Sequence, residues 1–226
     1  MNADDLKKVL AAHELWLGSN GRQGERADLS GVDLRGADLS NANLRRAKLR
    51  DADLIGADLT NANLNGADLT NADLRKPFLY RANLSDADLT GANLTGAYLS
   101  DANLSAADLD SAVLRGAYLR GADLTSAILF DADLTNADLS DAKLTGAKLT
   151  CAKLTCADLS GANLSRANLS GANLFRANLL GARLTHADFT DANLEGADYT
   201  AAINPNFARA HTPNPWVPCA CSICAA

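Results

Sequence analysis

The chain has 226 residues, with 27 acidic against 21 basic side chains and a formal net charge of −6. This mildly acidic, mixed composition argues against a basic nucleic-acid groove, so we expect no direct nucleic-acid binding. No stretch reaches the ~20 apolar residues of a membrane-spanning helix, and the charged first 17 residues do not resemble a secretory signal. We therefore expect a cytoplasmic protein without membrane contact.

Residues 1–26 are predicted to form an N-terminal capping helix and a linker. Asn2 is a suitable N-cap, and acidic residues follow in the first turn. Apolar side chains then recur at helical spacing with Trp16 beside them, namely Leu6, Val9, Leu10, His13 and Leu17. His13 has no neighbouring His or Cys, so it is interpreted as a half-buried cap residue rather than a ligand.

Residues 27–202 repeat a five-residue unit without insertion, beginning ADLSG VDLRG ADLSN ANLRR AKLRD. The first residue is nearly always Ala, the second Asp or Asn, the third Leu, the fourth often Ser, Thr or Arg, and the fifth small or polar. In an extended segment the first and third side chains share one face, so Ala and Leu are predicted to point inward and Asp or Asn outward. Gly, Asn and Asp at the fifth position favour a turn. The predicted core positions include Leu54, Leu59, Leu64, Leu69, Ala57, Ala62 and Ala67.

This unbroken A-[DN]-L-x-x tandem resembles the pentapeptide-repeat family. The resemblance implies an all-β fold, a right-handed quadrilateral parallel β-helix (a β-solenoid) with four units in each coil. At 20 residues per coil, the repeats would make about nine coils. Residues 20 apart would then form columns along the outside of the rod.

Two departures from the repeat stand out. Pro77 replaces an inward Ala, so a lost ladder donor and a local bulge or kink are expected there. Phe78, Tyr98 and Tyr118 replace Asp or Asn at 20-residue intervals and form one predicted aromatic column. The candidate interaction patch is this column with its neighbours, Phe78, Tyr80, Arg81, Tyr98, Tyr118 and Arg120. The column could be a ladder that stabilises its own wall or a docking patch for a partner.

Other columns are polar. Asn43, Asn63, Asn83 and Asn103 are predicted to form an amide ladder. Aspartates align in two further columns, Asp33, Asp53, Asp73 and Asp68, Asp88, Asp108, which would be tolerated through solvation. Basic residues crowd the first coils, so a basic end and an acidic middle are expected.

Residues 203–226 lose the repeat and contain four prolines, which predicts a C-terminal cover or flexible tail. Cys219, Cys221 and Cys224 lie there, but three thiols without a fourth ligand are a weak zinc signal, and we expect no metal site. The five cysteines suggest no disulfide framework.

An enzyme is not expected, because Ala and Leu fill the interior and leave no pocket for catalytic groups or a cofactor. The leading hypothesis is a rigid scaffold that presents its patterned surface to another protein. The alternative is DNA mimicry of the kind known for family members that protect topoisomerases from quinolones, with a type II topoisomerase such as gyrase as the partner. That model requires a homodimer, formed through an end of the rod. The interspersed basic residues depart from the acidic pattern of that subgroup. A bacterial effector domain or a stress-related structural protein is a third possibility, but no residue of the sequence specifically supports it.

Overall fold

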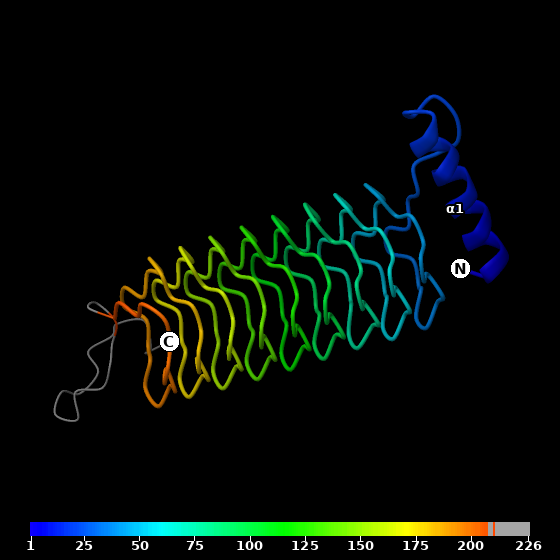
Figure 1. Ribbon diagram of the computed structural model, residues 1–226. Coiled ribbons are helices and arrows are strands. Elements are labelled where there is room, and N and C mark those ends of the chain that lie inside the picture. Colours follow the sequence, from blue (N-terminus) through cyan, green and yellow to red (C-terminus); the bar gives the residue numbers. More distant parts are fainter. Residues whose placement is uncertain (208–209, 211–226) are drawn as a thin grey trace.

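The computed structural model describes residues 1–207 and 210. Figure 1 shows an elongated, regularly coiled chain with one helix, α1 (Ala3–Gly18), lying across its N-terminal end. Most of the predicted C-terminal segment 203–226, including its three cysteines, lies outside the described residues. Within the described part of the chain, no helix is long and apolar enough to cross a membrane.

Parallel pairing between residues 20 apart builds the coil. The bridges run without interruption from the pair Asp28–Lys48 to the pair Arg183–Ile203, and each joins the second residues of two units. Each strand is therefore a single bridging residue, and the bridges recur every five residues along the chain. Four five-residue units fill each 20-residue interval, so the chain forms a parallel β-helix. The resemblance to the repeat family predicted this spacing.

Every backbone N–H of a regular unit has an acceptor, as the unit from Ala87 to Gly91 shows. Ala87 N donates to Leu84 O within the turn (3.1 Å), and Asp88 N donates to Ala67 O of the preceding coil (2.9 Å). Leu89 and Gly91 N donate to the following coil. The fourth N–H, of Thr90, donates to the Asp88 carboxylate (3.0 Å). Asp and Asn thus recur at the second position because their side chains accept this remaining N–H, an Asx turn.

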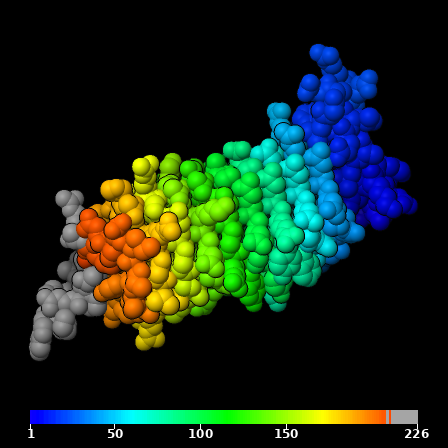
Figure 2. Space-filling view, viewed as in Figure 1, coloured from blue at the N-terminus to red at the C-terminus, as the bar shows by residue number. Residues whose placement is uncertain are grey.

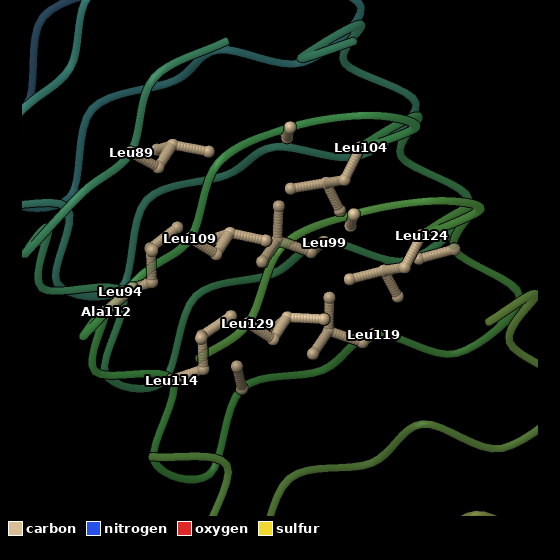
Figure 3. Close-up of a cluster of buried hydrophobic side chains, with 14 of the residues drawn as sticks. Leu89, Leu94, Leu99, Leu104, Leu109, Ala112, Leu114, Leu119, Leu124 and Leu129 are labelled. Carbon is tan, nitrogen blue, oxygen red and sulfur yellow. The ribbon is translucent and has the colours of Figure 1, made fainter. Parts of the chain in front are cut away.

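The interior consists of Leu and Ala alone over most of the coil. Figure 3 shows leucines of successive coils pointing toward one another across the inside. The predicted core positions named above are 0–1% exposed. A fully buried Leu contributes roughly 1.5–3 kcal/mol relative to an exposed one, so the stacked leucines are the main source of stability.

The fifth residue of each unit has a left-handed backbone. Its φ lies near +60° whether it is Gly91 (+67°), Asn71 (+57°) or Cys151 (+58°). This conformation costs an L-residue about 1–2 kcal/mol and costs Gly little. The preference for Gly, Asn and Asp at this position has that cause.

Replacing Gly91 by valine should therefore destabilise the rod. The new Cβ would lie 2.6 Å from Oδ1 of Asn71 on the preceding coil, in addition to the backbone strain. Gly116→Val is the matched control, because Gly116 has the same conformation with no atom within 4 Å of its added Cβ. We expect a loss of about 1–3 kcal/mol for Gly91→Val in urea unfolding and a smaller loss for the control. Equal losses would contradict the contact with Asn71.

Pro77 does not disturb the ladder, which corrects the expectation of a lost ladder donor and a bulge. The first residue of a unit donates only to the turn, so Pro77 removes a bond to Leu74 O and no bond between coils. Pro77 O still accepts from Tyr98 N (3.1 Å), and Phe78 N still donates to Ala57 O (2.9 Å). The pairing Asp58–Phe78–Tyr98 continues through it.

Helix α1 closes the open N-terminal end of the coil through His13. Asn2 caps the helix by accepting from Asp5 N (2.8 Å). His13 is fully buried rather than half-buried. Its Nδ1 accepts from Ala27 N (3.0 Å), and its Nε2 lies 3.1 Å from Arg45 O. In the middle of the rod, the equivalents of Ala27 N and Arg45 O form hydrogen bonds with the backbone of the preceding repeat. No repeat precedes the first coil, so the imidazole of His13 supplies both hydrogen-bond partners in its place. The two contacts require the neutral ring with its proton on Nε2.

Candidate interaction surface

The described part of the molecule presents the flat outer faces of the rod, rather than a cleft, to a binding partner. Two surface hollows, of about 680 and 330 Å³, lie beside α1, and residues 33–35 and 37–38 of the first repeats also line the second. Among residues 1–207 and 210, no group of three His, Cys, Asp or Glu side chains could hold a metal ion. Cys151 and Cys156 are exposed and free. Figure 2 shows the rod as a continuous surface of closely packed side chains, with α1 projecting at one end.

The aromatic column lies on one wall as a stack of nearly parallel rings. The ring centroids of Phe78 and Tyr98 are 5.3 Å apart, and those of Tyr98 and Tyr118 are 5.2 Å apart, with interplanar angles of 9° and 4°. Tyr80 joins the stack, 5.8 Å from Tyr98. Phe78 is 42% exposed and Tyr118 47% exposed. The stack is therefore both a ladder along the rod and a large exposed apolar surface.

The column interrupts the Asx turns of three successive coils. An aromatic second residue cannot accept the fourth N–H of its unit, and the amides of Tyr80, Ser100 and Arg120 have no acceptor among the described residues. Each lost bond is worth about 0.5–1.5 kcal/mol, and each ring stack gains a similar amount. The column therefore brings little net stability. It leaves three outward N–H donors beside the rings.

Basic residues border the column at one corner. Arg81 forms no ion pair with any described residue, and Arg120 lies 3.9 Å from Asp141. Along the column itself, the next residues on either side are acidic, Asp58 before Phe78 and Asp138 after Tyr118. The predicted patch residues thus form one contiguous surface. The sequence did not reveal its free N–H donors, because the Asx role of the second residue was not recognised.

Paired bases neutralise part of the acidic columns. Arg35 contacts both Asp33 (2.6 Å) and Asp53 (3.4 Å), and Arg75 contacts Asp73 (2.7 Å). The hydrogen bonds from Arg35 lower the pKa of Asp33 from 3.8 to about 2. These aspartates are thus ion-paired as well as solvated.

The expected basic end is wrong. Residues 27–66 hold five bases and six acids, and several bases there are used in ion pairs with the aspartate columns. The predicted amide ladder forms only in part. Asn83 Nδ2 donates to Asn63 Oδ1 (3.3 Å) and Asn103 Nδ2 to Asn83 Oδ1 (3.2 Å), whereas Asn43 donates to Glu14.

A family model described as "Pentapeptide repeats" (8 copies) matches overlapping stretches that together cover residues 27–125 and 127–198. The chain belongs to the pentapeptide-repeat family. The resemblance drawn from the A-[DN]-L-x-x tandem is thereby confirmed, and the right-handed β-helix that it implied is the fold of the related structures.

Solved structures of other pentapeptide-repeat proteins are similar to this chain. HetL, a protein involved in heterocyst differentiation regulation from the cyanobacterium Nostoc sp. strain PCC 7120, is 33% identical, covering 90% of this chain and 94% of HetL with a TM-score of 0.40. Rfr23 from the cyanobacterium Cyanothece 51142 is 42% identical over 42% of this chain and 63% of its own, with a TM-score of 0.23.

QnrB1, a plasmid-mediated fluoroquinolone resistance protein, is 19% identical over 82% of this chain and 89% of its own, with a TM-score of 0.43. None of the curated proteins matches the sequence.

Proposed function

We propose that this protein is a non-enzymatic, cytoplasmic rod that binds another protein through the aromatic column and the corner beside it. The rod is envisaged as four-sided with about nine coils, since four units fill each 20-residue interval along the repeats. The supporting observation is the interruption of three Asx turns in adjacent coils to expose four stacked rings. Other units lack this acceptor too, such as those with Val113 or Lys143 as the second residue, but this column combines three of them in adjacent coils with stacked rings. Such a local departure from a stabilising pattern is typical of functional surfaces.

The chemistry of the patch suits a protein partner. Tyrosine rings and arginine are enriched at the centres of interfaces, where they supply most of the binding energy. The rings are held by mutual stacking, so little side-chain entropy is lost when a partner packs on them. The amides of Tyr80, Ser100 and Arg120 point outward at the same corner and can donate to carbonyl or carboxylate groups of an extended segment.

Replacing Phe78, Tyr98 and Tyr118 together by asparagine should abolish partner binding while keeping the fold. Asparagine is an ordinary second residue of the repeat and restores the Asx acceptors, so thermal stability should not fall. We expect at least about a 10-fold loss of partner recovered in a quantitative pull-down, as for removal of interface hot spots.

The matched control replaces Asn63, Asn83 and Asn103 by serine on a different column and should leave binding intact. If the aromatic variant and the unaltered protein recovered every partner equally, the aromatic column would not be the binding site. A photo-crosslinking residue at Ser100 identifies the partner, and the same residue at Ser165 on another wall shows the background.

A second candidate function is DNA mimicry toward a type II topoisomerase. The observation in its favour is an acidic stretch over residues 87–146, where nine acids face three bases. A gyrase supercoiling assay decides it, since a mimic changes supercoiling or its inhibition by quinolones. The absence of either effect at micromolar protein removes this candidate and leaves the first untouched.

A further inference from the structure

Charge is arranged in bands along the rod, a pattern that the proposed docking patch does not use. Residues 87–146 carry nine acids and three bases, and residues 147–186 carry one acid, Asp158, and five bases. Residues 187–206 again carry acids only. Because each coil takes 20 residues, these stretches are successive bands around the rod. A negative band of three coils thus directly adjoins a positive band of two.

One column of paired residues crosses this boundary, and its side chains change from acidic through apolar to basic. The Ile128 column consists of the paired second residues Asp88, Asp108, Ile128, Lys148 and Asn168. Ile128 lies at its middle, and the half-buried ring of Phe130 lies beside it at the corner. Lys148 lies one coil to one side of Ile128, and Asp108 one coil to the other.

The two charges on either side of Ile128 are free to pair outside the chain. Lys148 forms no ion pair with any described residue, and its Nζ lies 6.0 Å from the centre of the Phe130 ring. Asp108 accepts one backbone N–H, from Asp110 (3.0 Å), and has no basic partner in the described part of the chain. The two side chains lie two coils apart, about 10 Å at the strand spacing, which is too far for an ion pair.

We propose that two copies of this chain associate side by side and antiparallel through the Ile128 column. A two-fold axis through Ile128 exchanges the coil before it with the coil after it. Asp108 of each copy then faces Lys148 of the other, which gives two symmetric ion pairs. The two copies of Ile128 meet at the centre. Such a self-complementary patch is what an isologous interface requires. The negative band of each copy lies along the positive band of its partner.

The geometry also indicates how strong this dimer is and where it places the two docking patches. One column and its two corners bury less than the ~1,600 Å² of a standard interface, so the dimer should be weak and sensitive to salt. The aromatic column begins at Phe78 and lies ten residues, half a coil, around from the Ile128 column. Side-by-side pairing therefore leaves both docking patches facing outward, unlike pairing through an end.

Charge exchange tests the contact in the full chain. Lys148→Asp and Asp108→Lys each place like charges at both symmetric contacts, whereas the double variant restores opposite charges. Lys153→Asp is the matched control on a neighbouring column. Sedimentation equilibrium at 50 and 500 mM salt measures the dissociation constant, and circular dichroism reports the fold of each variant.

The unaltered chain should dimerise at low salt and dissociate at high salt. Each single variant should weaken the dimer at least ~10-fold, and the double variant should return to within ~3-fold of the original. A monomer at every concentration, an unaffected single variant, or a folded double variant that fails to recover overturns the proposal. Lys148→Asp should fold, because Asp is the usual residue at the second position of the unit. If Asp108→Lys does not fold, the effect of Lys148→Asp on the dissociation constant is sufficient to test the proposal.

Discussion

Leu89→Ala should lower the free energy of unfolding by about 2–5 kcal/mol, the range for buried leucines replaced by alanine. Leu89 is fully buried, and it lies among the leucines of neighbouring coils (Figure 3). The interior holds one Leu and one Ala per unit, so no larger side chain is available to fill the cavity. Urea unfolding followed by circular dichroism measures the loss.

Thr90→Ala is the matched control for this prediction. Thr90 is the next residue and lies on the outside, and its contribution to the Asx turn comes from its backbone N–H, which alanine keeps. Its effect should stay within about 0.5 kcal/mol. Similar losses for Leu89→Ala and Thr90→Ala would mean that the third position is not inward.

His13→Ala should separate the capping helix from the first coil. The change leaves Ala27 N and Arg45 O without their partner at the open end, at a cost of roughly 1–3 kcal/mol for each group that stays buried. It also removes the ring that stacks on Trp16, 5.6 Å away. Hydrogen exchange at the Ala27 amide should become faster, while exchange in the middle of the rod should not change.

Lys8→Ala serves as the control for the helix. Lys8 lies on the exposed side of α1, in an exposed pair with Asp5 that contributes little. An Ala27 amide that remains equally protected in His13→Ala would rule out the proposed capping role.

The same contact makes the cap sensitive to acid. Burial lowers the pKa of His13 below its ordinary value of 6.5, because the charged ring would lose water and would point a second N–H at Ala27 N. The hydrogen bond with the Arg45 backbone and the charge of Glu14 raise this pKa, and Arg26 lowers it, so the effect of burial is only partly offset. Trp16 stacks on the ring, and Arg46 lies over Trp16. A lowered folded-state pKa means that the contribution is complete above pH 6.5 and is lost as the pH falls through the folded value.

This pH window is distinct from that of the aspartates. The pKa of Asp33 is lowered to about 2 from 3.8, so its contribution is present above pH 3.8 and is lost below that value. Melting curves between pH 7 and 5 should therefore show a loss in the unaltered chain that His13→Ala lacks. The same slope in both proteins would exclude His13 as its source.

The interior of the rod was predictable from the sequence because the repeat is strict. Ala and Leu two residues apart share one face of an extended segment, and no helical period accommodates a repeat of five. The 20-residue coil came from the resemblance, since spacing alone does not fix how many units close a coil. The aromatic column followed once that interval was known.

What the sequence did not predict depends on hydrogen bonds between side chain and backbone. Asp and Asn at the second position looked like solvated surface residues, whereas they accept the fourth N–H of the unit. Pro77 appeared to break the ladder because the role of each N–H was unknown. His13 appeared half-buried because its partners, Ala27 and Arg45, are 14 and 32 residues away.

The central claim is that residues 20 apart are neighbours on adjacent coils with their side chains outward, and disulfide trapping tests it most directly. In a chain with its five cysteines replaced by serine, Asn83→Cys with Asn103→Cys places two thiols on paired strand residues at about 4.8 Å between Cα atoms, within disulfide range. The account predicts rapid, complete oxidation of this pair and none for Asn83→Cys with Asn93→Cys, half a coil apart. Oxidation of the second pair but not the first would contradict it.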